Sequence, residues 1–101
     1  MSSRTWDHTE VGRVTGLDGD AAALGAAVTT VLCGHWEHDG PCRWPHFTSP
    51  EVREHDVLVT VYFDAPAGEE QEVRALIRHA LAKGCLVGPD GTTTAWQPAT
   101  P

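Results

Sequence analysis

The sequence predicts an α+β fold of the ferredoxin-like type, a βαββαβ plait in which a four-stranded antiparallel sheet carries two helices on one face. Two observations support this prediction. Segments that alternate with a period of two, as strands do, are interleaved with segments whose apolar residues recur every three or four positions, as in helices. Their order is strand, helix, strand, strand, helix, strand, which is the split βαβ arrangement of such plaits. With 101 residues, the chain has the length of one domain, so residues 1–101 are expected to form a single unit with frayed ends at 1–7 and 97–101.

The first strand is expected at Thr9–Thr15, where β-branched and polar residues alternate, with Gly12 as the site of a bulge. The glycines of 16–19 then indicate a turn. Asp20 follows and has the side chain of a helix cap. The helix predicted behind it ends at Gly34, and one of its faces is apolar: Leu24, Ala27, Val28, Val31 and Leu32.

The next strand is expected within Cys42–Val52. Because Pro45 and Pro50 cannot donate ladder hydrogen bonds, it should lie at an edge of the sheet or be broken by a bulge, and the plait topology favours the edge. The segment His55–Asp64 predicts the central strand, since it alternates strictly. Its two faces are Val57, Val59, Val61 and Phe63 on one side and Leu58, Thr60 and Tyr62 on the other.

The second helix is predicted from Glu69 to Lys83, with an acidic start that suits the helix dipole. Its apolar face consists of Val73, Leu76, Ile77, Ala80 and Leu81. A hairpin-like pair or one kinked strand is then expected in the segments Cys85–Val87 and Thr92–Trp96. In the predicted plait, these two segments together form the last strand.

The composition of the chain argues against two classes of binding partner, nucleic acids and membranes. The formal net charge is −7, and the seven basic residues are scattered singly along the chain, so no basic stripe for nucleic acid or for an anionic membrane is expected. No apolar run approaches the roughly 20 residues that cross a bilayer. Because the first residues also lack the apolar stretch of a signal peptide, the cytoplasm is the expected compartment.

Residues 33–46, with the sequence CGHWEHDGPCRWPH, concentrate the side chains that bind borderline and soft metal ions. The sequence therefore predicts a transition-metal site, with zinc as the favoured ion and another transition metal as the alternative. The candidate ligands are Cys33, His35, His38, Cys42 and His46. His46 joins this site only if Pro45 bends the chain, because an extended strand separates it from Cys42 by about 13 Å.

Two alternatives use the same segment without a metal. In one, His38 or His46 acts as a general acid or base beside Glu37, in a pocket for a small molecule lined by Trp36, Trp44 and Tyr62. In the other, the aromatic loop docks a partner protein as an interaction module. A disulfide between Cys33 and Cys42 is a further geometric alternative. The sequence does not decide whether the chain is an enzyme.

The face of the sheet that the helices leave uncovered is expected to carry Leu58 and Tyr62, which are too apolar to remain in water. A homodimer through this open face is therefore predicted. In length and predicted topology the chain resembles the dimeric α+β barrel group, in which two open faces meet and enclose a cavity. That resemblance implies a dimer, and an enzyme or small-molecule-binding protein of that type is the alternative to a metal-binding protein.

Overall fold

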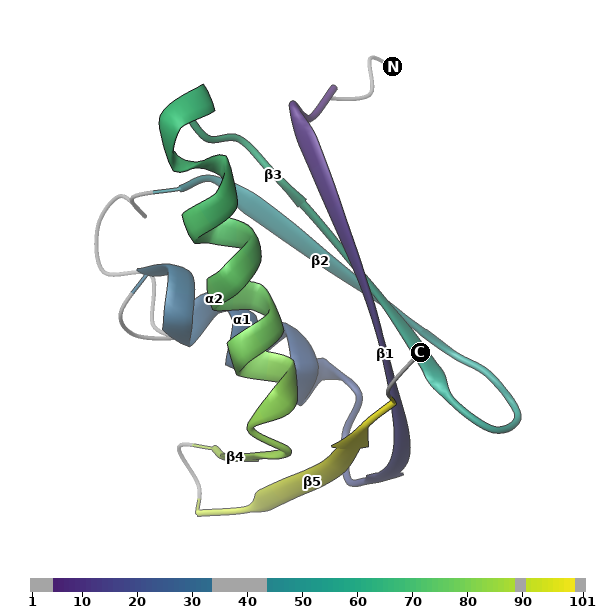
Figure 1. Ribbon diagram of the computed structural model, residues 1–101. Helices are drawn as coiled ribbons and strands as arrows, with labels where there is room; N and C mark the ends of the chain where they lie inside the picture. Colours follow the sequence, from purple (N-terminus) through teal and green to yellow (C-terminus); the bar gives the residue numbers. More distant parts are fainter. Residues whose placement is uncertain (1–4, 34–43, 89–90, 100–101) are drawn as a thin grey trace.

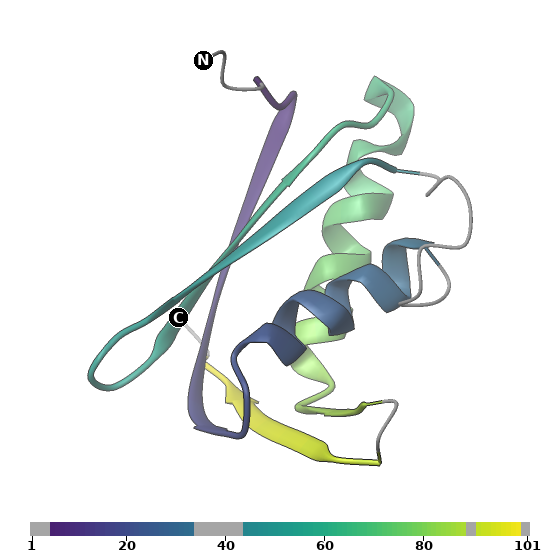
Figure 2. The same cartoon turned by 180° about the vertical axis from the view of Figure 1, so that it is seen from behind.

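A computed structural model of the chain describes residues 5–33, 44–88 and 91–99. Its strands form one antiparallel sheet in the order β2-β3-β1-β5-β4. The sheet curls into a half-barrel, and both helices lie on the same face of it (Figures 1 and 2). The elements are β1 (His8–Asp18), α1 (Ala22–Cys33), β2 (His46–Val52), β3 (Val57–Phe63), a 3-10 turn (Ala67–Glu69), α2 (Glu70–Ala82), β4 (Cys85–Val87) and β5 (Thr93–Pro98).

The predicted ferredoxin-like plait is wrong, because the sheet has five strands in the described residues and curls. The difference arises after α2, where the chain forms two strands instead of one. β4 and β5 pair with each other, and the turn between them is closed by a bond from Gly88 N to Thr92 O of 2.8 Å. β5 then pairs with β1, so the hairpin adds an outer strand. Of the predicted features, the edge position of β2 and the placement of both helices on one face are confirmed.

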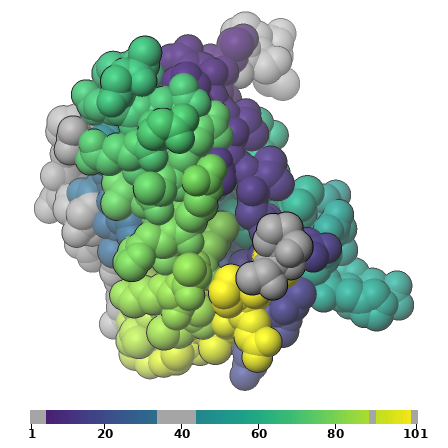
Figure 3. Space-filling view, in the orientation of Figure 1, coloured from purple at the N-terminus to yellow at the C-terminus, as the bar shows by residue number. Residues whose placement is uncertain are grey.

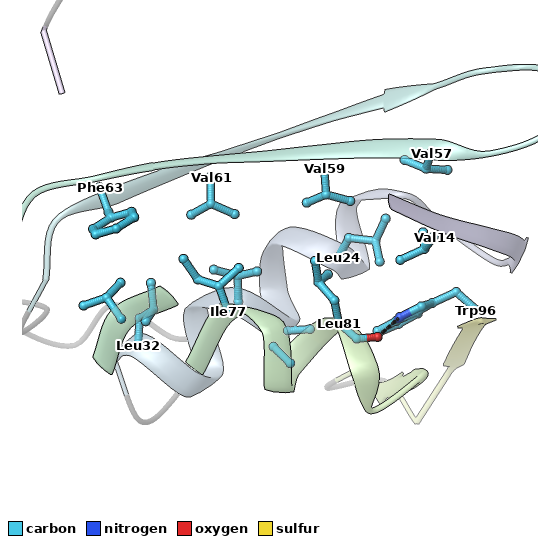
Figure 4. Packing of buried hydrophobic residues seen from close by; sticks show 14 of the residues in the cluster. Val14, Leu24, Leu32, Val57, Val59, Val61, Phe63, Ile77, Leu81 and Trp96 are labelled. Carbon is cyan, nitrogen blue, oxygen red and sulfur yellow. Dashed lines mark hydrogen bonds between the residues drawn. The ribbon is translucent and has the colours of Figure 1, made fainter. Parts of the chain in front are cut away.

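The hydrophobic core lies between β3 and the two helices. The inward side chains of β3 are all buried and project in a row toward Leu24, Leu32 and Ile77 (Figure 4). This confirms the alternation read from the sequence, because a period of two puts every second residue on one face. The helices contribute the residues expected of them: Leu24, Ala27, Val28 and Leu32 from α1, and Val73, Ile77, Ala80 and Leu81 from α2.

β1 is longer than predicted and continues through the expected turn to Asp18. Gly16 has a φ of 61°, a conformation that glycine adopts readily, and the pairing of β1 with β5 shifts register between Thr15 and Asp18. β5 then closes one end of the core with Trp96, which is buried. Its indole nitrogen donates to Leu81 O at 2.8 Å, so the ring is held at its polar end as well.

Two local predictions have clear outcomes. Asp20 does cap α1, because its Oδ1 accepts a bond from Ala22 N at 2.9 Å. Gly12 is not a bulge toward β3, since β1 pairs with β3 without interruption from His8 to Val14. The reason for a glycine there is packing. A Cβ at this position would overlap Leu81 Cδ1, so the missing side chain lets α2 approach β1 closely.

Candidate functional site

The predicted site of residues 33–46 is described only at its ends. Cys33 closes α1, Trp44 precedes β2, and His46 is the first residue of β2. The other predicted site residues in this segment lie outside the described residues: His35, Trp36, Glu37, His38 and Cys42. The remaining pocket residue, Tyr62, projects from β3 on the open face, away from the core.

His46 is held by internal hydrogen bonds. Its side chain lies on the helix side of β2, where Nε2 is 2.9 Å from Thr29 Oγ1 on α1 and Nδ1 is 3.1 Å from Trp44 O. Because a carbonyl only accepts, Nδ1 carries the proton and Nε2 accepts from the threonine hydroxyl. Trp44 is buried, and its indole nitrogen donates to Glu69 Oε1 at 2.9 Å. In this arrangement both residues tie β2 to the helical layer.

Cys33 is disulfide-bonded, whereas Cys85 is a free and exposed thiol. The disulfide alternative therefore agrees with the state of Cys33, and a disulfide sulfur is not the thiolate that binds zinc. Among the residues that the structure describes, no three His, Cys, Asp or Glu side chains form a group that could hold a metal ion. The description of the chain as a zinc-binding plait is thus corrected to a small α+β domain with no metal-binding group in its described part. Zinc as a cofactor stays an untested prediction.

The open face of the sheet forms a grid of three rows across β2, β3 and β1. In the first row the rings of Phe47 and Tyr62 stack with their centroids 6.4 Å apart, and Phe47 is 56% exposed. Val11, in the second row, is 54% exposed. The third row ends in two opposite charges. The rows are Phe47, Tyr62 and Thr9, then Ser49, Thr60 and Val11, then Glu51, Leu58 and Arg13.

A chain of charged groups lies where α2 crosses β1. Glu10 points inward from β1 and is 9% exposed, and its two carboxylate oxygens accept from Arg74 Nη1 at 2.8 Å and from Arg78 Nε at 3.0 Å. Arg74 also donates to Glu70 Oε2 and to Thr9 O, both at 2.8 Å. The bond from Arg74 holds the pKa of Glu70 below its usual value, and the bond with Glu10, followed by the one with Glu70, raises the pKa of Arg74.

Beside this charged cluster, a groove of about 470 Å³ runs between β1 and α2. In Figure 3 the green surface of α2 lies directly beside the purple surface of β1. The groove is mainly apolar, and Arg78 stands at its rim. The lining residues that matter here are Val11, Ile77, Leu81, Ala82, Pro98 and Ala99. A groove of this volume is within the range of small-molecule sites.

The sequence reading missed both the charged cluster and the groove, although one signal was available. Glu10 lies four residues before Val14 in the first strand, so strict alternation places both side chains on the core side of the sheet. A carboxylate in that position needs a cationic partner. Arg74 and Arg78, four residues apart on one helix, supply that partner. The groove itself depends on where β5 stops, and no local pattern indicates that.

The described helices are too short or too polar to cross a membrane. No family model matches the chain, and no curated protein or solved structure is significantly similar to it.

Proposed function

We propose that this chain is a binding protein that acts as a homodimer, with the open faces of two sheets packed against each other. The observation that carries the proposal is the stacked pair Phe47 and Tyr62 on the open face, next to the exposed side chain of Val11. Exposed apolar and aromatic side chains that lie together on one face are typical of interaction surfaces, and burying them against a partner is favourable.

The cytoplasm is retained as the proposed compartment, although a disulfide at Cys33 is more typical of an oxidising one.

The arrangement of charges on this face favours a second copy of the chain as the partner. Glu51 and Arg13 flank Leu58 from opposite sides in the third row. In a symmetric dimer with its two-fold axis along β3, each Glu51 would face Arg13 of the other copy. Leu58 would then face its own counterpart, and so would Tyr62. The face is therefore complementary to itself in both charge and apolar character.

The test is the molar mass in solution, measured by sedimentation equilibrium over a range of protein concentrations. We expect the 10.9 kDa chain to sediment with twice its mass at high concentration. Phe47→Glu should give a monomer, because it buries a charge beside the ring of Tyr62 in the interface. Val52→Glu is the matched control. Val52 is also on β2 and is 65% exposed, but its register with Val57 places it on the other face.

A charge exchange tests the symmetry of the proposed dimer. Glu51→Arg alone should weaken self-association, since it sets like charges opposite each other twice in the dimer, and Arg13→Glu alone should do the same. The double variant should restore association. Circular dichroism checks that each variant is folded. A wild-type chain that stays monomeric at several hundred micromolar, or a Phe47→Glu chain that still dimerises, would show that the open face is not the interface.

A further inference from the structure

On one of its two sides, β1 is paired with a neighbouring strand along only part of its length. β3 pairs with it from His8 to Val14, whereas β5 pairs with it at Val14, Thr15 and Asp18. The chain then adds one more bond, from Ala99 N to Arg13 O at 2.9 Å. Beyond that bond, no strand in the described part of the chain lies along this side of β1. The first half of β1 is therefore a free sheet edge, although β1 is the middle strand of the sheet order.

The direction of the backbone groups at this edge follows from two bonds. The carbonyls of Arg13 and Thr9 both point to the free side, where they accept from Ala99 N and from Arg74 Nη1. Backbone groups alternate along a strand, so Val11, which lies between them, also directs its N–H and C=O to this side. Within residues 5–33, 44–88 and 91–99, nothing bonds to these two groups. Unpaired N–H and C=O groups at a sheet edge are a template for another strand.

The groove described above lies along this same edge. Ala82 supplies exposed apolar surface on the α2 side, above the buried side chains of Ile77 and Leu81, and Pro98 and Ala99 mark the end where β5 stops. Arg78 stands at the rim with a side chain that is 64% exposed. Its bond with Glu10 uses Nε, so its terminal nitrogens remain for an anionic group, with no other partner among the described residues. The groove thus offers a backbone template, an apolar wall and a cation.

We propose that this groove binds an extended peptide segment, which adds to β1 as a further strand. The stretch from Thr9 to Gly12 spans about 10 Å, so it accommodates about three residues of the ligand. Val11 exchanges backbone hydrogen bonds with the middle of the segment, small apolar side chains pack on the exposed surfaces of Ala82 and Pro98, and a carboxylate of the peptide pairs with Arg78. A small apolar acid would use the wall and Arg78 but not the backbone of Val11, and that difference separates the two classes of ligand.

This site adjoins the proposed dimer interface and shares Val11, Arg13 and Leu58 with it. Strand addition uses the backbone of β1 in the plane of the sheet, whereas the dimer uses the side chains of the open face. Peptide binding by the Phe47→Glu variant therefore tests the groove independently of self-association. If that variant is monomeric and still binds peptide, the groove acts without the dimer.

The test begins with amide hydrogen exchange of the full chain, followed by NMR. The amide of Val11 should exchange quickly in the free protein, unlike that of its neighbour Gly12, which faces β3. Random heptapeptides displayed on phage are then selected on the immobilised chain, and the synthetic peptide that is recovered serves as the probe. Its binding should slow exchange at Val11 by at least about ten-fold. An N-methylated version of its central residue should lose binding, because it cannot donate to Val11 O.

Two substitutions place the probe in the groove. Ala82→Phe fills the groove from an exposed position of α2 and should abolish binding without unfolding the chain. Arg78→Gln should weaken the binding of an acidic probe by about five-fold or more, whereas Lys83→Gln, one residue past the end of α2, should not change it. The proposal is overturned if Val11 is protected in the free chain, if no peptide is recovered, or if a bound peptide leaves the Val11 amide unchanged. It is also overturned if decanoate binds the groove and the peptides do not.

Discussion

Replacing Glu10 by glutamine should destabilise the protein markedly, although the two side chains have nearly the same shape. The carboxylate of Glu10 accepts two charge-assisted bonds in a nearly buried position, from Arg74 at 2.8 Å and from Arg78 at 3.0 Å. Glutamine can accept only through its oxygen, and its NH₂ group would face a second donor. One of the two arginines therefore loses its bond to residue 10 and faces the NH₂ group of glutamine instead.

The size of this effect follows from the exposure of the two arginines. Arg78 is 64% exposed, so water replaces much of its lost bond, but Arg74 is only 19% exposed. A hydrogen bond to a buried charged group contributes about 1.5–3 kcal/mol, so we expect Glu10→Gln to reduce the free energy of unfolding by about 2 kcal/mol. For a domain of this length, that corresponds to a fall in Tm of about 10 °C.

Urea denaturation followed by circular dichroism measures this change, with Glu54→Gln as the control. The side chain of Glu54 is 88% exposed, so its replacement should change the free energy of unfolding by less than about 0.5 kcal/mol. A cycle that combines Glu10→Gln with Arg74→Gln should show a coupling of about 1 kcal/mol or more. If Glu10→Gln is as mild as the control, or if the two substitutions are additive, the bonds between Glu10 and Arg74 do not stabilise the fold.

Two further predictions concern pH and an unpaired hydroxyl. The bond from Arg74 keeps the pKa of Glu70 in the folded protein below its usual value of 4.5, so its stabilising contribution is complete above pH 4.5 and is lost as the pH falls through the lowered pKa. The difference in Tm between wild type and Glu70→Gln should therefore be present at pH 7 and shrink in thermal scans below pH 4.5; a constant difference would contradict this. Thr48 Oγ1 is buried with no hydrogen-bond partner among the described residues, so Thr48→Val should raise the free energy of unfolding by about 1 kcal/mol in urea titrations. A loss of stability in that variant would mean that the hydroxyl has a partner.

Much of the fold could be predicted because its signals are local. The alternation in Val57–Phe63 fixes which side chains of β3 are buried, and the apolar spacing in Glu70–Ala82 fixes the inward face of α2. The number of strands could not be predicted in the same way. The segment Cys85–Trp96 fits one kinked strand or a hairpin equally well by pattern, and the pairing of β5 with β1 decides between them.

The same distinction between local signals and tertiary contacts applies to the candidate sites. The sequence by itself determined where metal-binding residue types gather and that Leu58 and Tyr62 share the uncovered face, because residue identity and parity are properties of the chain. Only the tertiary structure decided that Thr29 of α1 bonds to Nε2 of His46, since this bond joins separate elements. It also decided that Glu10 meets two arginines from α2, and that β5 stops short of Val11 and leaves a groove. Such contacts depend on how the sheet curls, and the curl is set by the packing of the whole chain rather than by any one segment.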